Sequence, residues 1–359
     1  MTVKWLAGNR IEGTSADRTT GTPAIPAVSG GWKEVGRTTL GSAGDDIDVT
    51  SIPDKRYYHI LVSQLPTGSA VGKLTLNNSG STYTRRFSVN GASDTAQSSL
   101  SEIGLTTTET NPNFQSIYLA NLSSKEKLGL VHNVRQNTAG AGNAPNRAEQ
   151  VFKWTNTSDA INRVDVYNSS TGSFNTNSEV VVLGYDPDDT HTDNFWEELA
   201  DVSLSSASDT LSSGTITAKK YLWVQTYVKA TGGTVEPDSR FNNDNSGTNN
   251  VSGTYADRYS VNGGSDATGT SLNKGVRGSG VPVSAFFNDF IINNASNEKL
   301  VIRHVNYVST AGLNVPNRRE TVGKWSNTSD QITNITWHDE SGSGAQMDSG
   351  SFIKVWGSN

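Results

Sequence analysis

The chain has 359 residues, of which 33% are hydrophobic and 18% charged, with a formal net charge of −6. This length suits about two domains, and the chain has no run of about 20 apolar residues of the kind that spans a membrane. The negative charge and the lack of a basic run argue against nucleic-acid binding. The sequence contains no cysteine, which excludes disulfides and thiolate chemistry.

The chain begins with a segment, residues 1–31, that has no counterpart later in the sequence. It includes Pro23, Pro26 and the pair Gly30–Gly31. This composition predicts an extended N-terminal arm rather than a domain. The segment has neither a continuous apolar core nor a small-residue cleavage site, so we expect no secretory signal peptide here.

After this arm the sequence repeats itself. KWTNTSD at 153–159 returns as KWSNTSD at 324–330, and RFSVNG at 86–91 returns as RYSVNG at 258–263. The offset between equivalent residues stays between 164 (Trp32 to Trp196) and 172 (Arg86 to Arg258). Solenoid and propeller repeats run only about 20–50 residues, so this offset indicates two copies of a whole domain. We predict domains at 32–184 and 195–359, joined by a polar connector at 185–194.

Short segments rich in β-branched and aromatic residues alternate with Asn, Gly and Ser turn signals. In copy one they predict strands at 47–52, 56–62, 83–89, 115–121, 127–135, 148–154, 161–167 and 178–184. In copy two, residues 220–228 are the counterpart of 56–62, and residues 195–200 alone are predicted to form a helical turn. Roughly eight short strands per copy are typical of a sandwich. We therefore predict an all-β chain with two tandem β-sandwich (jelly-roll) domains; another Greek-key sandwich stays open.

The residues that recur in both copies offer little for catalysis. Of the five histidines, only His132 and His304 are equivalent. Each lies in a predicted strand with no Ser elbow or HExxH motif nearby, which favours a structural role over that of a base or ligand. The recurring acids Glu149 and Glu320 each follow an arginine by two residues, so we expect ion pairs rather than the paired acids of a glycosidase. The prediction is a chain without enzymatic activity.

The motif Pro-Asn-Arg-x-Glu precedes a strand that ends in Lys-Trp in both copies. Its functional interpretation is a loop in which Asn and Arg bind a sugar or carboxylate. The simpler interpretation, which we favour, is a turn whose Arg bridges to a neighbouring loop or subunit. The strand-ending residues Trp154 and Trp325 are predicted to lie in the cores. The candidate interaction residues of the motif are Asn146, Arg147, Glu149, Asn317, Arg318 and Glu320.

Oxygen-bearing side chains gather at two further places. The connector holds Asp186, Asp188, Asp189 and Asp193, and an inserted loop of copy two holds Asn242, Asn243, Asp244 and Asn245. Calcium takes such ligands, but neither segment follows EF-hand spacing, and solvated acidic loops are the simpler interpretation. Calcium is thus the one cofactor with candidate ligands. Asn242, Asn243 and Asp244 are also candidate interaction residues.

A set of distinctive segments extends over essentially the whole chain. They are the opening MTVKWLAGNRIEGTS, RFNND at 240–244, the Thr-Ala-Gly and Pro-Asn-Arg-x-Glu motifs, and the closing GSFIKVWG at 350–357. Together they resemble a family of tandem-repeat virion structural proteins common in environmental, mainly marine, viruses and bacteriophages. The resemblance brings no catalytic residues. Copy one departs from it at Leu76–Ser79, where the RFNND loop is shortened, so no binding role is expected for that loop there.

The resemblance implies a virion protein, made in the host cytoplasm, that assembles with itself as a trimer or larger and with other virion proteins. The arm is then a candidate for tying subunits together. A double jelly-roll major capsid protein and a capsid decoration or tail-fibre protein both stay open. The alternative from another class is a pair of carbohydrate-binding modules that attaches to cell-surface glycans, which predicts exposed aromatic residues in matching loops.

Overall fold

The computed structural model describes residues 31–80, 82–189, 193–245, 253–342 and 346–359. Within these ranges the chain is all-β and forms two sandwich domains, as the strand pattern predicted. No helix of the described part has the length and hydropathy to cross a bilayer. Nearly all of the predicted arm lies outside the described residues.

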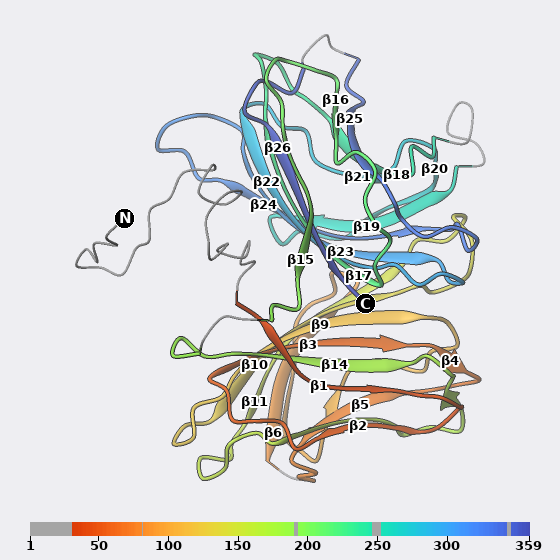
Figure 1. Cartoon of the computed structure of the whole chain (residues 1–359), viewed down its shortest axis with the longest axis vertical. Helices are drawn as coiled ribbons and strands as arrows, with labels where there is room; N and C mark the ends of the chain where they lie inside the picture. Colours follow the sequence, from red (N-terminus) through yellow and green to blue (C-terminus); the bar gives the residue numbers. More distant parts are fainter. Residues whose placement is uncertain (1–30, 81, 190–192, 246–252, 343–345) are drawn as a thin grey trace, which may run out of the picture.

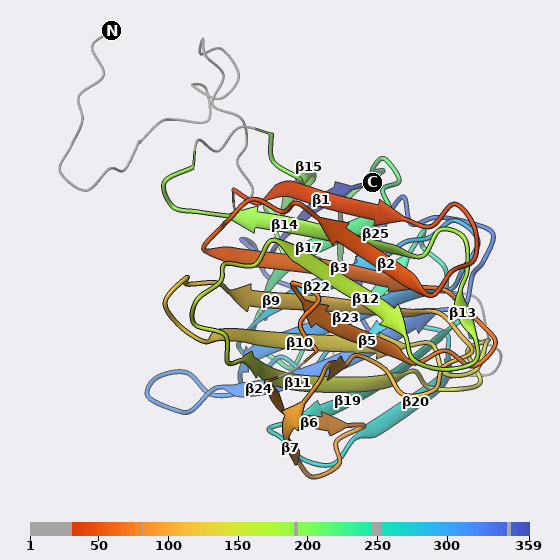
Figure 2. The ribbon, with the colours of Figure 1, turned by 90° about the horizontal axis from the view of Figure 1, so that it is seen from below.

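Copy one forms one sheet of eight strands and one of four. The larger sheet has the order β1-β14-β3-β9-β10-β11-β6-β7 and the smaller β2-β12-β5-β8, with antiparallel pairing throughout (Figure 2). The strands are β1 (Lys33–Thr39), β2 (Asp46–Thr50), β3 (Tyr57–Gln64), β4 (Pro66–Thr67), β5 (Gly72–Leu76), β6 (Tyr83–Val89), β7 (Thr95–Leu100), β8 (Ile103–Gly104), β9 (Asn113–Ala120), β10 (Lys127–Arg135), β11 (Asn146–Trp154), β12 (Arg163–Asn168), β13 (Ser173–Phe174) and β14 (Glu179–Tyr185).

Copy two repeats the order of these two sheets, whereas the two-stranded sheet β13-β4 of copy one has no counterpart among the described residues of copy two. Its larger sheet has the order β15-β26-β17-β22-β23-β24-β19-β20 and its smaller sheet β16-β25-β18-β21. The strands are β15 (Glu197–Ser203), β16 (Thr210–Ser212), β17 (Tyr221–Lys229), β18 (Pro237–Phe241), β19 (Tyr255–Val261), β20 (Ala267–Leu272), β21 (Val276–Arg277), β22 (Ser284–Ile292), β23 (Lys299–Val308), β24 (Asn317–Trp325), β25 (Ile335–Asp339) and β26 (Phe352–Ser358).

The helical turn predicted at 195–200 is wrong. Residues Glu197–Ser203 form the edge strand β15, which pairs with β26 through a bulge between Glu198 and Ala200. The bulge shifts the apolar residues off strict alternation, which made the segment look helical. Pairing with the neighbouring strand decides the conformation of so short a segment.

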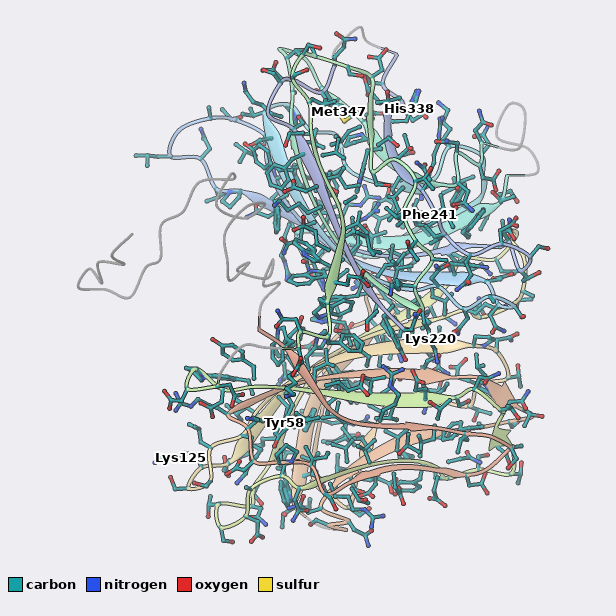
Figure 3. The ribbon with its side chains drawn as sticks, in the orientation of Figure 1. Tyr58, Lys125, Lys220, Phe241, His338 and Met347 are labelled. Atoms are coloured by element: carbon teal, nitrogen blue, oxygen red, sulfur yellow. The ribbon has the colours of Figure 1, made fainter. Side chains whose placement is uncertain are left out.

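Each sandwich has its own core between its larger and smaller sheet. Figure 3 places Tyr58 inside the lower sandwich and Phe241 and Met347 inside the upper one, and these three residues are at most 1% exposed. Trp154 and Trp325 are each 1% exposed and belong to these cores, which confirms the prediction for the strand-ending tryptophans.

The two larger sheets lie face to face, so the molecule has four layers with the smaller sheets outside (Figure 1). A third apolar core fills the space between the larger sheets. Central strands such as β3 are therefore buried on both faces, and seven of its eight residues are buried. This double burial explains the near-continuous apolar run of its sequence.

Candidate functional site

Copy one covers part of copy two with apolar side chains. From copy one, Leu61, Phe114, Val134, Val181 and Leu183 enter the third core. They pack there with side chains of copy two that include Tyr221, Phe290, Leu300, Ile302 and Val322. The shared core explains how two domains joined by a short connector hold one relative orientation.

His132 and His304, the equivalent histidines of β10 and β23, meet at the middle of this junction. Their ring centroids are 4.3 Å apart in an edge-to-face arrangement. Burial, the other histidine and Arg147 lower the pKa of His132 to about 3, and burial and Arg147 lower that of His304 to about 4. Both rings are neutral at pH 7, so they act as packing groups of the junction rather than as bases.

Arg147 forms the charged link beside the histidines. Its side chain is 6% exposed, and it donates to Asp266 of copy two at 2.6 Å and to Glu149 of its own strand. Burial alone would lower the pKa of Arg147, but Asp266 and Glu149 outweigh this effect and raise it. The space left between the arginine, the acids and the histidines is about 10 Å³, room for roughly one water and no sugar.

Further polar contacts fix the rim of the junction. Glu179 of copy one accepts a hydrogen bond from the Tyr221 hydroxyl at 2.7 Å and pairs with Lys220 at 3.0 Å, and Figure 3 shows Lys220 where the copies meet. The buried Lys324 ammonium donates to the carbonyl of Thr138 at 2.6 Å. Because these charges are partnered across the junction, separating the copies would leave several of them uncompensated.

The Pro-Asn-Arg-x-Glu residues lie in and beside this junction. Asn146 accepts from Asn90, and Asn317 accepts from Asn262 in the matching turn. Arg318 pairs with Glu320 at 2.8 Å, yet its side chain is 62% exposed. The bridging that we favoured for this motif is therefore present at Arg147, which joins a loop of the other copy.

The RFNND loop of copy two has its polar atoms engaged within the protein. Asn242 accepts from the backbone of Thr333, and Asn243 accepts from the Thr336 hydroxyl. Asp244 accepts from the indole of Trp325 at 2.7 Å. Asn242 and Asp244 line a shallow polar pocket of about 580 Å³.

The connector acids do not converge on one point. Asp189 pairs with Lys55, Asp193 lies 3.6 Å from Lys33, and Asp186 accepts from the backbone of Asp188. Among the described residues no group of three or more acids and histidines is arranged to hold a metal ion.

The described surface has an apolar groove of about 840 Å³, which we call the copy-one groove. All of its lining residues belong to copy one, and it lies on the face of the larger sheet that also meets copy two. Sequence reasoning missed this feature, although Leu128 and Leu130, which lie on the same face of β10, were its signal. Its main apolar side chains are Trp32, Tyr57, Tyr118, Leu128, Leu130 and Val151.

The same positions have opposite environments in the two copies. Tyr57, Leu128, Leu130 and Val151 are 42%, 57%, 49% and 48% exposed. Their counterparts in copy two, Tyr221, Leu300, Ile302 and Val322, are at most 4% exposed because copy one covers them. The apolar face is therefore covered in copy two. In copy one the equivalent face is exposed within the described part of the chain.

Comparison with known proteins gives no family for the chain. No family model matches it, and no curated protein matches it. Among solved structures, domains LG4-5 of the mouse laminin alpha1 chain are similar at 8% identity and a TM-score of 0.19, over 92% of this chain and 91% of that one. A likeness of this size implies neither a shared site nor a shared function.

Proposed function

We propose that the chain is a non-enzymatic structural protein of a virion that assembles with other copies of itself through the copy-one groove. The observation that supports this function is the contrast between the repeats. Equivalent apolar side chains are covered in copy two and about half exposed in copy one. Contiguous exposed apolar faces often mark interaction sites on soluble proteins.

The energetics favour an assembly with several contacts per chain over a lone pair of chains. Burying a large apolar side chain fully stabilises by about 1.5–3 kcal/mol, so four half-exposed side chains contribute on the order of 5 kcal/mol. Association costs about 4–15 kcal/mol in lost freedom of motion. A single contact between two chains through the groove is therefore weak. A closed ring or shell, in which every chain makes this contact, is the stable form.

The virion role rests on the sequence resemblance together with the build of the molecule. The two sandwiches form a rigid double unit, and the repeated acids Glu149 and Glu320 are paired with arginines. A capsid protein and a decoration or fibre protein both use such a unit, and both are made in the host cytoplasm and end in the virion. Other virion proteins are further partners under this proposal.

A second candidate is binding of a cell-surface glycan in the same groove. Trp32 and Tyr185 have ring centroids 5.7 Å apart, Tyr57 and Tyr185 6.3 Å apart, and Arg86 and Lys153 supply polar groups nearby. Aromatic faces with polar neighbours suit sugar rings, which present apolar C–H faces and hydroxyl edges.

Replacing Leu130 by Asp tests the assembly function. The charge in the groove should lower the weight-average mass of the full chain in sedimentation equilibrium, because an unpaired carboxylate cannot be buried there. Leu313→Asp is the matched control, since Leu313 is fully exposed in a loop of copy two. Equal masses for Leu130→Asp and the unaltered chain would count against the assembly face.

Binding of Tyr57→Ala to a glycan array distinguishes glycan binding from self-assembly. If the sugar is the natural ligand, the unaltered chain binds specific glycans, Tyr57→Ala loses them, and neither depends on the assembly state. If the chain assembles and binds no glycan, only the structural function is supported.

A further inference from the structure

We propose that the copy-one groove takes residues Thr22–Val28 from the N-terminal segment of a second copy of this chain. The inference rests on the proposed self-assembly and names the part of the neighbour that enters the groove. The occupant has to be apolar, because Leu128, Leu130 and Val151 project into the groove and are about half exposed.

The face of copy two that corresponds to the covering face of copy one is polar at its central positions. Within the chain, Leu61, Val134 and Val181 of copy one help to cover copy two. The equivalent positions of copy two carry Gln225, Asn306 and Lys354, which are polar. A neighbour therefore cannot cover the groove with copy two in the way that copy one covers copy two.

The N-terminal segment supplies the missing apolar sequence. Residues 22–28 read Thr-Pro-Ala-Ile-Pro-Ala-Val, with Pro23 and Pro26 in a Pro-x-x-Pro arrangement. Segments of this kind favour an extended polyproline conformation and dock in grooves lined by aromatic rings. The copy-one groove is lined in this way by Trp32, Tyr57, Tyr118 and Tyr185.

The segment is long enough to fill about three quarters of the groove. Seven residues in a polyproline conformation extend about 22 Å, at roughly 3.1 Å per residue. The groove crosses the larger sheet from β14 to β7, which are six strand spacings apart in the sheet order. At about 4.8 Å per spacing this distance is roughly 29 Å.

The connection to Trp32 favours a neighbour's segment over the chain's own. Only Ser29, Gly30 and Gly31 separate Val28 from Trp32, which itself lines the groove. If the segment entered its own groove, these three residues would form the whole hinge between the segment and Trp32. Short hinges that must fold back favour exchange of the segment between chains, which is a low-cost route to oligomers.

Because the chain has no cysteine, an engineered pair reports this contact without background. The test mixes a full-length Ile25→Cys chain with a full-length, tagged Leu130→Cys chain under mild oxidation. We expect a disulfide between the two different chains, seen by mass on a non-reducing gel. Mixing Ile25→Cys with tagged Leu313→Cys is the matched control and should give several-fold less product.

A second form of the test puts Ile25→Cys and Leu130→Cys in one chain. Disulfide-linked dimers and larger species support the proposal, whereas a monomer closed by an internal disulfide overturns it by showing that the chain fills its own groove. No product above the control also overturns it. If no such product forms while Leu130→Asp still lowers the assembled mass, self-assembly through the groove is supported. Only the assignment of residues 22–28 as its occupant is then wrong.

Discussion

Arg147 and Arg318 occupy equivalent positions in the same motif, yet their surroundings differ. The Arg147 side chain is 6% exposed and reaches Asp266 across the junction, whereas the Arg318 side chain is 62% exposed. The sequence predicted the pairing of each arginine with the glutamate two residues later. It did not predict Asp266, which is 119 residues from Arg147, because that contact depends on how the two copies pack.

The two arginines therefore form a matched pair of mutations. Arg147→Met should lower the free energy of unfolding by about 3–5 kcal/mol, because the buried Asp266 keeps only the longer contact to Arg258 at 3.9 Å. Arg318→Met should cost at most about 1 kcal/mol, as for an exposed ion pair. Urea unfolding measures both values, and similar losses for the two variants would show that the Arg147 link is not buried in solution.

The paired histidines predict a dependence of stability on pH. In the folded chain the pKa values of His132 and His304 are about 3 and 4, below the ordinary value of 6.5. As the pH falls below about 6.5 the unfolded chain binds protons that the folded chain excludes, so the free energy of unfolding decreases down to about pH 3. Above about pH 6.5 this contribution is fully present.

Replacing both histidines by Gln removes their share of this effect. The double variant should lose less of its free energy of unfolding between pH 7 and pH 5 than the unaltered chain, as measured by urea unfolding at both values. Equal losses in the two chains would show that these rings are hydrated and titrate normally.

Among the strands, one cross-strand pair is reversed between the copies. Gly129 of β10 faces Phe152 of β11 in copy one, and Val301 of β23 faces Gly323 of β24 at the equivalent place. A Cβ atom on Gly129 would lie 2.2 Å from the Phe152 ring, so the large side chain occupies the space above the glycine. Each copy therefore keeps one apolar side chain and one glycine at this pair.

This reversal predicts that the two positions compensate. Gly129→Val should destabilise the chain by about 1–3 kcal/mol through overpacking, and Phe152→Gly by about 3–5 kcal/mol through the cavity it leaves. The double variant recreates the pair of copy two and should cost less than the sum of the two. Thermal or urea unfolding gives the three values, and strictly additive losses would contradict the compensation.

Strand prediction was right for the long apolar segments and missed several shorter strands. The strand predicted at 127–135 is β10, and that predicted at 83–89 is β6. The internal strand β5 and the edge strand β7 went unpredicted. So did the edge strand β1, and its counterpart β15 was mistaken for a helical turn. Both are edge strands with a bulge, and their half-exposed residues carry a weak alternation that pairing with β14 and β26 overrides.

For the whole molecule, the internal repeat predicted two sandwiches but not their face-to-face packing. The residues that form the third core, such as Leu61 and Leu300, read in sequence as ordinary strand residues, because a strand buried on both faces and one buried on a single face differ only in a few positions. The copy-one groove follows from the same packing. It is the part of one larger sheet that the other larger sheet does not cover.

The central claim is that this open face assembles copies of the chain. Its most direct test is the solution mass of the unaltered full chain by light scattering over a wide range of concentration. The account predicts a trimer or a larger closed species that forms as the concentration rises. A strict monomer at every concentration would contradict it and would leave the groove as a candidate site for glycans.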